Sequence, residues 1–350
     1  MLLGNLNLRK KIGQGGMATV WLAEHQRDTS TFAVKMMHAA FINDDTATQR
    51  FLAEARAISQ LDHSGIVKIY DYGLISSIEA TQRDSELFPI GLPYCVMQYH
   101  PQGTYKSPAI VNDWSSLKRE LLLIMEAITL VHAHGIVHCD LKPSNILRGE
   151  SGPIISDFGI IHHLNPQNID YHLTPAKQTL SGTPSYMSPE QIRTETDSFG
   201  PWTDLYAIAC ITYFLATGRP PYNAPLAMTR MLQHLQDPLP SLSPLFPVPA
   251  ALEGWIHWCM SKNPNQRPRF TYEALEAFQT LGEAHRTAPV VLGNRALPLM
   301  SGSSPKSLLE KRPEYTVDQM DRVSERALMT LIDEESRISH ISQGQVQYHS

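Results

Sequence analysis

The chain has 350 residues, of which 42% are hydrophobic and 18% are charged. This length allows two lobes or two domains around a large core, and the composition is typical of a globular protein. The formal net charge of −5 argues against a general surface for nucleic acid or for an anionic membrane. We therefore expect neither kind of partner.

The cysteines and the apolar segments favour a soluble protein of the cytoplasm. The four cysteines are scattered without Cys-x-x-Cys spacing, which indicates reduced thiols rather than a disulfide framework or a zinc site. The longest apolar run, Leu205 to Ala216, is too short to span a membrane. The N-terminal residues also lack the pattern of a signal peptide.

Residues 6–35 have the pattern of β-strands, with Gly13, Gly15 and Gly16 between two strand-like runs. Glycines at such a turn allow the backbone N–H groups to approach a ligand, and phosphate is the natural ligand for them. A glycine-rich stretch by itself is more often a plain hairpin turn. Both interpretations remain open from these residues alone.

Residues 45–61 predict an amphipathic helix, because their apolar side chains repeat at helical spacing. Glu54 lies on this helix and, taken alone, would be a solvated carboxylate. Two further strands are predicted at residues 66–73 and 94–99. The segment between them, about 76–93, is polar and longer than typical strand connections, which indicates a surface insertion.

Residues 114–134 predict a long helix that ends at Gly135, a residue type suited to the position just after a helix. Three histidines lie on or just after this helix: His132, His134 and His138. Scattered helix and loop histidines are more often structural than metal ligands, so we expect no metal site here.

The next stretch carries the chemistry of the chain. Residues 146–156 consist of two short apolar runs around a glycine-bounded turn, which predicts a β-hairpin. A hairpin brings its ends together, so Asn145 and Asp157 should converge, and their oxygens are suitable ligands for Mg²⁺ bound to phosphate. Asp140 could then orient or deprotonate a hydroxyl, with Lys142 beside it to neutralise phosphate charge. These residues predict a phosphoryl-transfer site.

Residues 138–145 and 157–159 resemble the catalytic and metal-binding loops of the protein kinase family, with Cys139 where most members have arginine. The run Gly13 to Val20 resembles the loop that covers the ATP phosphates in this family, with Ala18 in place of the third glycine. Its sequence Gly15-Gly16-Met17 is most similar to the bacterial branch of eukaryotic-like serine/threonine kinases.

The resemblance covers roughly residues 6–284 and implies an α+β fold of two lobes with ATP between them. We expect a kinase domain at 1–284, with a small β-rich N-lobe at about 1–97 and a larger helical C-lobe at about 101–284. The remaining residues, 285–350, form a C-terminal extension whose residues 316–340 predict an amphipathic helix. That helix could pack on its own domain or form a partner or dimer contact, and the sequence favours neither.

The resemblance also implies the roles of the site residues. Asp140 would orient the acceptor hydroxyl and take its proton, Lys142 would balance charge, and Asn145 and Asp157 would hold Mg²⁺. Lys35, paired with Glu54, would position the α- and β-phosphates of ATP. Met97 would lie behind the adenine and Leu147 beneath it, and the backbone groups of Gln98 and His100 would bond the adenine edge. The other residues expected to contact the nucleotide are Ile12, Gly13, Gln14, Gly15, Gly16, Met17, Ala18, Val20 and Ala33.

Residues 159–190 resemble the activation segment of the family, with Ser188 in place of the usual alanine. The family pattern implies a buried ion pair between Glu190 and Arg267. We also expect Asp204 to cap the apolar helix that follows it.

Cys139 bears on regulation. In most of the family, the arginine at this position binds a phosphorylated residue of the activation segment through charge-assisted hydrogen bonds. A thiol carries no positive charge and is a weak donor. We therefore expect activity to depend only weakly on phosphorylation of Thr174 or Thr179.

The resemblance implies a serine/threonine protein kinase that transfers the γ-phosphoryl group of ATP, with Mg²⁺, to hydroxyls of protein substrates. Lys142 together with Thr183 is the pairing seen in members specific for serine and threonine. The alternative is a pseudokinase that binds nucleotide as a scaffold, motivated by the replacements at Cys139, Ala18 and Ser188. None of these removes a side chain that would contact phosphate or metal, which favours the enzyme.

Overall fold

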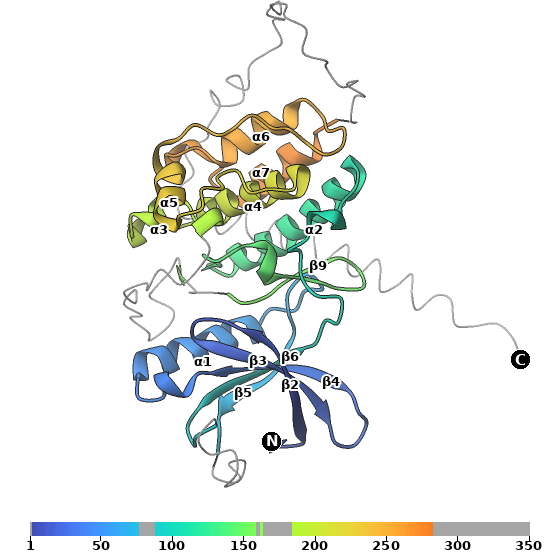
Figure 1. Cartoon of the computed structure of the whole chain (residues 1–350), viewed down its shortest axis with the longest axis vertical. Helices are drawn as coiled ribbons and strands as arrows, with labels where there is room; N and C mark the ends of the chain where they lie inside the picture. Colours follow the sequence, from blue (N-terminus) through green and yellow to red (C-terminus); the bar gives the residue numbers. More distant parts are fainter. Residues whose placement is uncertain (1, 77–87, 159–161, 164–183, 283–350) are drawn as a thin grey trace, which may run out of the picture. The chain divides into compact units, whose positions relative to one another are not determined.

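The computed structural model describes residues 2–76, 88–158, 162–163 and 184–282. They belong to one compact unit, Met1–Arg286, in which a β-rich N-lobe is followed by a larger helical C-lobe (Figure 1). The predicted bilobal α+β fold is confirmed. The threonines at 174, 179 and 183 and the helix predicted at 316–340 lie outside the described residues.

The N-lobe is a six-stranded antiparallel sheet with the strand order β1-β2-β3-β4-β6-β5. Its strands are Leu2–Leu3 (β1), Leu6–Gln14 (β2), Ala18–His25 (β3), Thr31–Met37 (β4), Ile69–Leu74 (β5) and Pro93–Gln98 (β6). Strand β4 lies inside the sheet, where Lys35 is opposite Val20 on one side and Cys95 on the other. The lysine backbone is therefore fixed by both neighbouring strands.

Strand β5 begins at Ile69, three residues later than the predicted start. Ile66 instead forms a parallel bridge with Ile155 of the C-lobe, and the Val67 N–H donates to the Ile155 carbonyl at 2.9 Å. Residues 65–67 thus join the two lobes rather than extend the sheet.

Helix α1, Asp45–Ser59, packs against β5 and β6 on one side of the sheet (Figure 1). It begins where the Asp44 carboxylate accepts a hydrogen bond from the Ala47 N–H at 2.9 Å, a typical N-cap. Its residues Ala55 and Ile58 are buried on the face toward the sheet, as the helical spacing of the apolar residues predicts. This packing directs the neighbouring Glu54 toward the sheet.

The described residues of the C-lobe are mainly helical and include four short strands. Its helices are Trp114–Ala133 (α2), Pro189–Ile192 (α3), Pro201–Thr217 (α4), Ala227–Gln236 (α5), Ala251–Cys259 (α6) and Thr271–Gln279 (α7). Its strands are Ile136–Val137 (β7), Ile146–Arg148 (β8), Pro153–Ile155 (β9) and His162–His163 (β10). Helix α2 starts with a capping box between Asp113 and Ser116 and ends before Gly135, whose φ of 71° agrees with the predicted helix end. None of the helices in the described part of the chain is long and apolar enough to cross a membrane.

Helix α4 is mostly apolar, is buried along almost its whole length and presents no polar face to solvent. The prediction that Asp204 caps this helix is wrong. The helix begins at Pro201 with Gly200 as its N-cap, and Asp204 lies one turn inside with 1% of its surface exposed. Its carboxylate binds backbone groups of another segment, described below.

The predicted hairpin is formed by β8 and β9, with Ile146 opposite Ile155. It brings its two ends together, because the Asn145 side-chain amide donates to the Asp157 carbonyl at 3.3 Å. The expected convergence of Asn145 and Asp157 is therefore present in the structure.

Candidate active site between the lobes

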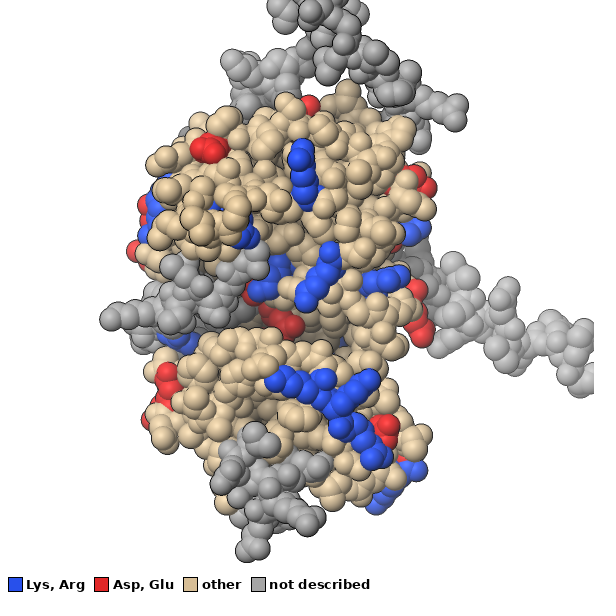
Figure 2. All heavy atoms as spheres, in the orientation of Figure 1, with Lys and Arg blue, Asp and Glu red and all other residues tan. Residues whose placement is uncertain are grey.

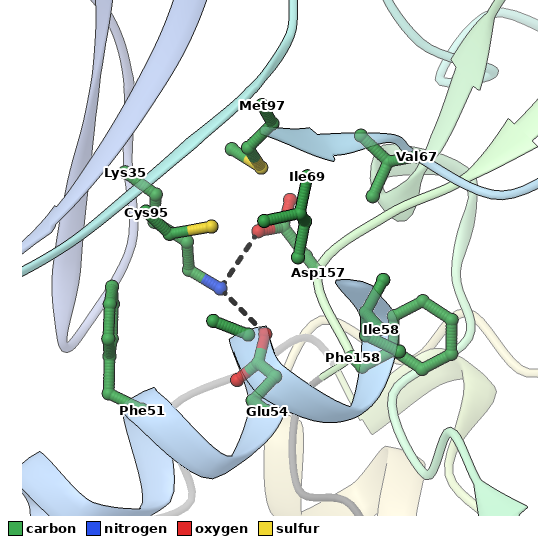
Figure 3. A pocket seen from close by; sticks show the side chains of 11 residues that line it. Lys35, Phe51, Glu54, Ile58, Val67, Ile69, Cys95, Met97, Asp157 and Phe158 are labelled. Atoms are coloured by element: carbon green, nitrogen blue, oxygen red, sulfur yellow. Dashed lines mark hydrogen bonds and ion pairs between the residues drawn. The ribbon is translucent and has the colours of Figure 1, made fainter. Parts of the chain in front are cut away.

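Lys35 makes two ion pairs at the centre of the site (Figure 3). Its ammonium lies 3.0 Å from Glu54 Oε1 on α1 and 3.1 Å from Asp157 Oδ1 after β9. The pair predicted between Lys35 and Glu54 is present. The lysine also reaches the Asp157 carboxylate, so three segments far apart in sequence meet at one charge.

The electrostatics of this group favour the charged forms of Lys35 and Asp157, whereas burial raises the pKa of Glu54 above its ordinary value. Burial would lower the pKa of Lys35, but the Glu54 and Asp157 carboxylates outweigh this effect, and the pKa lies above its ordinary value. Burial would raise the pKa of Asp157, but Lys35 more than offsets it, so the pKa is lowered. An ammonium and a carboxylate therefore stand side by side at neutral pH.

A cavity lies beside the ion pairs, between α1, β5, β6 and Asp157 (Figure 3). Its lining is mostly apolar, with the charged groups at one side: Lys35, Phe51, Glu54, Ala55, Ile58, Val67, Ile69, Cys95, Met97, Asp157 and Phe158. The space-filling view shows a hollow between the lobes with acidic atoms inside it and Lys and Arg atoms near both edges (Figure 2). The side chains of Lys35 and Asp157 are 18% and 37% exposed, so these charges are partly open to solvent.

The glycine-rich stretch forms the turn between β2 and β3, with Gly13 opposite Val20 and the Gly15 N–H donating to the Ala18 carbonyl at 2.8 Å. Packing does not require glycine there. A Cβ atom would meet only ordinary contacts, 3.5 Å from Val20 at Gly13 and 3.6 Å from Ala18 at Gly15, and neither residue has a positive φ. This observation favours a ligand over a plain turn as the reason for glycine.

The residues of this stretch that are expected to contact the nucleotide lie in two strands and in the turn between them. Ile12, Gly13 and Gln14 end β2, Gly15, Gly16 and Met17 form the turn, and Ala18 and Val20 begin β3. Ile12 and Met17 are 40% and 49% exposed, so both apolar side chains are accessible from the solvent.

The apolar residues expected around adenine belong to one hydrophobic cluster or pack against it. Ala33 lies opposite Met97 across β4 and β6, and both belong to the hydrophobic cluster that joins the two lobes. Val20 and Leu147 pack against the same cluster from the sheet and from the β8–β9 hairpin. These four residues therefore border the same cluster, and their contact with adenine stays a prediction.

The two predicted backbone contacts to adenine come from the connection between the lobes. The Gln98 N–H donates to the Lys68 carbonyl at 2.9 Å, so this N–H is used inside the protein. His100 follows β6, and its carbonyl accepts from the Gly103 N–H at 3.5 Å. Burial lowers the pKa of the His100 imidazole, which is therefore neutral.

Asp140 is held by two donors of the catalytic loop. Its Oδ2 accepts from the Lys142 ammonium at 2.6 Å and from the Asn145 amide at 3.0 Å. The Asp140 side chain is 38% exposed, so the carboxylate is both oriented and open to solvent. Such a group can accept a proton from a hydroxyl placed before it.

The backbone of this loop is fixed by Asp204 of α4. The Asp204 carboxylate accepts from the N–H groups of His138 at 2.8 Å and Cys139 at 2.9 Å, and from His132 Nε2 at 2.8 Å. Burial would raise the pKa of Asp204, but the hydrogen bond from His132 and the nearby histidines outweigh it and lower the pKa. The buried carboxylate therefore stays ionised and anchors the loop.

His138 connects the catalytic loop with the Asp157 segment. Its Nδ1 accepts from the Asp140 N–H at 3.2 Å, and Nε2 lies 3.2 Å from the Ser156 carbonyl, to which it donates in the neutral tautomer. Burial lowers the pKa of His138, in agreement with a neutral ring. The ring packs on Phe158 at 4.4 Å between centroids. The prediction that this histidine is structural agrees with these contacts.

Two oxygen ligands, Asn145 and Asp157, fit a Mg²⁺ ion bound together with phosphate. The Asn145 Nδ2 donates to Asp140 and to the Asp157 carbonyl, which leaves Oδ1 as its oxygen ligand. Within the described residues there is no group of three or more His, Cys, Asp or Glu that could hold a metal. Mg²⁺ does not need one, because it is commonly held by one or two protein ligands together with substrate phosphates and water.

The predicted pair between Glu190 and Arg267 is confirmed. Two parallel bonds of 2.8 Å join the guanidinium to the carboxylate, and both side chains are 0% exposed. The pair ties helix α3 to the loop before α7.

Gln191 is a residue that the sequence prediction missed. Its side-chain amide donates to the Cys139 carbonyl at 2.6 Å, one residue before Asp140. The available signal was the Ser188-x-x-Gln191 spacing, which is typical of a capping box at a helix start. That signal predicts the helix but not the contact.

Comparison with known proteins agrees with this geometry. The family model described as "Protein kinase domain" matches residues 6–279. The chain belongs to the protein kinase family. The matched range contains every residue of the candidate site and nearly all of the range expected for the kinase domain.

Similar curated proteins are bacterial kinases. The chain is 36% identical over 287 residues to a "Probable serine/threonine-protein kinase PknB" of Bifidobacterium longum, a match covering 79% of this chain and 39% of that protein. It is 34% identical to a protein of the same name from Lactococcus lactis, covering 74% and 39%. It is 35% identical to "Serine/threonine-protein kinase PrkC" of Bacillus subtilis, covering 78% and 40%. The kinase-like chain thus spans about two fifths of the length of these relatives.

Proposed function

We propose that this chain is a serine/threonine protein kinase that transfers the γ-phosphoryl group of ATP to hydroxyls of protein substrates. The observation that carries the proposal is the ion-pair system of Lys35, whose ammonium contacts Glu54 at 3.0 Å and Asp157 at 3.1 Å. A pseudokinase has no need for this geometry together with an oriented Asp140. The names of the bacterial relatives support the same activity.

The proposed reaction uses positioning and electrostatics rather than covalent catalysis. Lys35 holds the α- and β-phosphates, and the backbone of the Gly13–Val20 loop covers them. The acceptor hydroxyl lies before Asp140, which takes its proton. The hydroxyl oxygen forms a bond to the γ-phosphorus while the bond to the ADP oxygen breaks, and Lys142 balances the charge that develops.

Asn145 and Asp157 would hold Mg²⁺. When bound, the ion would neutralise charge on the phosphate oxygens. Both residues lie close together, because Asn145 donates to the Asp157 carbonyl. The ionised state of Asp157, which Lys35 supports through a lowered pKa, suits this role.

We further propose that residues 1–284 are the catalytic domain and that residues 285–350 are an extension with a partner or packing role. The predicted cytoplasmic location rests on the supply of ATP there and on the scattered cysteines.

The test is phosphate transfer from radiolabelled ATP with Mg²⁺ to a generic basic protein substrate or to the chain itself. Asp157→Asn should remove at least about 99% of the transfer, because the metal ligand loses its charge, while the fold is retained. Asp197→Asn, a change at an exposed carboxylate of the C-lobe, is the matched control and should transfer at the parent rate. Undiminished transfer by Asp157→Asn would contradict the metal assignment.

A second variant separates binding from chemistry. Lys35→Met should lose most of the transfer, whereas its affinity for ATP should fall much less, because the lysine acts mainly on the phosphates. A parent protein that binds ATP but transfers no phosphate would favour the pseudokinase alternative.

A further inference from the structure

The peptide group between Cys139 and Asp140 is held at both of its polar atoms. The Cys139 carbonyl accepts from Gln191 Nε2 at 2.6 Å, and the Asp140 N–H donates to His138 Nδ1 at 3.2 Å. The plane of this peptide sets the direction in which the Cα–Cβ bond of Asp140 leaves the backbone. Two hydrogen bonds from different segments therefore determine where the proposed base points.

The orientation of the Gln191 amide is itself fixed. Its Oε1 accepts from the Ser188 N–H at 3.0 Å and from the Ser188 hydroxyl at 3.2 Å. A backbone N–H can only donate and a carbonyl can only accept, so a flipped amide would place like groups together at both ends. Gln191 is 7% exposed and Ser188 is 0% exposed, so water does not compete readily for these bonds.

Cys139 needs this restraint because its backbone is in an uncommon conformation. Its φ is +60°, in the left-handed region that residues other than glycine adopt only at a cost in free energy, and such residues persist when their surroundings hold them. The Asp204 carboxylate holds the Cys139 N–H at 2.9 Å, and Gln191 holds the carbonyl of the same residue. Removal of the second restraint would let the following peptide rotate toward a relaxed conformation.

We propose that Gln191 is a positioning residue for Asp140, and that it couples the segment ending at Ser188 to the proton acceptor of the reaction. The inference rests on the proposed kinase function and goes beyond it, since it assigns a role in catalysis to a side chain that touches neither ATP nor the acceptor hydroxyl. When the Ser188 segment is in place, the amide is oriented and the Cys139 carbonyl is held. The link is independent of an arginine at position 139.

The test compares the parent with two neighbouring variants of the full chain. Gln191→Met fills a similar volume but removes the donor to the Cys139 carbonyl. Ser188→Ala is the matched control, because it removes only the 3.2 Å hydroxyl bond to the same amide and keeps the Ser188 N–H and the Gln191 link. For each protein, kcat, the KM for ATP and the melting temperature are measured. Amide hydrogen exchange is followed in the peptide that covers residues 138–142.

For Gln191→Met we expect kcat to fall at least about tenfold with the KM for ATP within about twofold of the parent, because misplacing a catalytic group affects chemistry more than ATP binding. Exchange in residues 138–142 should become faster. Ser188→Ala should keep both close to the parent. A folded Gln191→Met protein with parental kcat and exchange would overturn the inference, as would equal losses in both variants, which would indicate a general structural role.

If Gln191→Met does not fold, Gln191→Glu gives the same comparison, since it keeps the shape and the acceptor for Ser188 but loses the donor. Failure of both variants to fold would also overturn the inference, because the residue would then be needed for folding rather than positioning. A parent without phosphate transfer would refute the proposed function. The exchange measurement would still decide whether Gln191 holds the loop.

Discussion

Arg267→Ala should destabilise the protein strongly, because it leaves a buried charge without its partner. The Arg267 guanidinium makes two 2.8 Å bonds to Glu190 and donates to the Trp202 carbonyl at 3.1 Å and the Ser261 carbonyl at 2.8 Å. It also stacks over the Tyr206 ring at 4.8 Å. Both charged side chains are 0% exposed, so water cannot replace the lost donor without a structural change.

The loss of one partner of a buried pair typically costs about 3–5 kcal/mol of unfolding free energy. At about 2–4 °C per kcal/mol for a domain of a few hundred residues, the melting temperature should fall by about 6–20 °C. The change is measured by calorimetry or by urea unfolding followed with circular dichroism. The double variant Glu190→Leu with Arg267→Met should be more stable than Arg267→Ala, because no unpaired charge remains.

Arg9→Ala is the control for burial. The Arg9–Glu24 pair is as short as the buried one, at 2.7 Å, but its side chains are 52% and 34% exposed. Surface pairs contribute about 0–1 kcal/mol, so this variant should melt within about 4 °C of the parent. If Arg267→Ala lost no more stability than Arg9→Ala, the reasoning from burial would be refuted.

Three further predictions concern pH, regulation and the C-terminal extension. Burial lowers the pKa of His234 from 6.5 to about 3, so below pH 6.5 only the unfolded chain takes up this proton and the unfolding free energy falls as pH drops toward 3. Urea unfolding between pH 7 and pH 5 should therefore show a steeper loss for the parent than for His234→Asn, and equal slopes would contradict the assignment. The Cys139 thiol offers no charge-assisted hydrogen bond, of about 1.5–3 kcal/mol, to a phosphorylated activation segment. A parent protein first treated with phosphatase should therefore gain less than about tenfold in phosphate-transfer rate on incubation with ATP, and the double variant Thr174→Ala/Thr179→Ala should behave in the same way. A large gain in rate that the double variant lacks would overturn this prediction. Removal of residues 285–350 should leave phosphate transfer intact, because the described core lies before them, and loss of transfer by a folded truncated protein would assign the extension a catalytic role.

The sequence alone predicted the features that depend on neighbouring residues. Helical spacing of apolar side chains predicted α1 and α2, and Gly135 predicted where α2 ends, because helix periodicity and caps are local properties. The apolar runs at 146–156 predicted the hairpin and hence the approach of Asn145 to Asp157. The ion pair of Glu190 and Arg267 required more than local pattern, and only the family resemblance supplied it.

Tertiary structure decided the contacts between residues far apart in the chain. Asp204 was predicted to cap α4, and the family resemblance implied only that this helix anchors the catalytic loop; in the structure the Asp204 carboxylate itself binds backbone N–H groups of that loop, 65 and 66 positions away. Gln191 likewise follows a local capping pattern, and only the fold places its donor at the Cys139 carbonyl. Local pattern determines where a helix begins and which face is apolar. Which buried acceptor a polar side chain satisfies depends on the packing of all the elements around it, because a buried polar group must find a partner wherever the fold provides one.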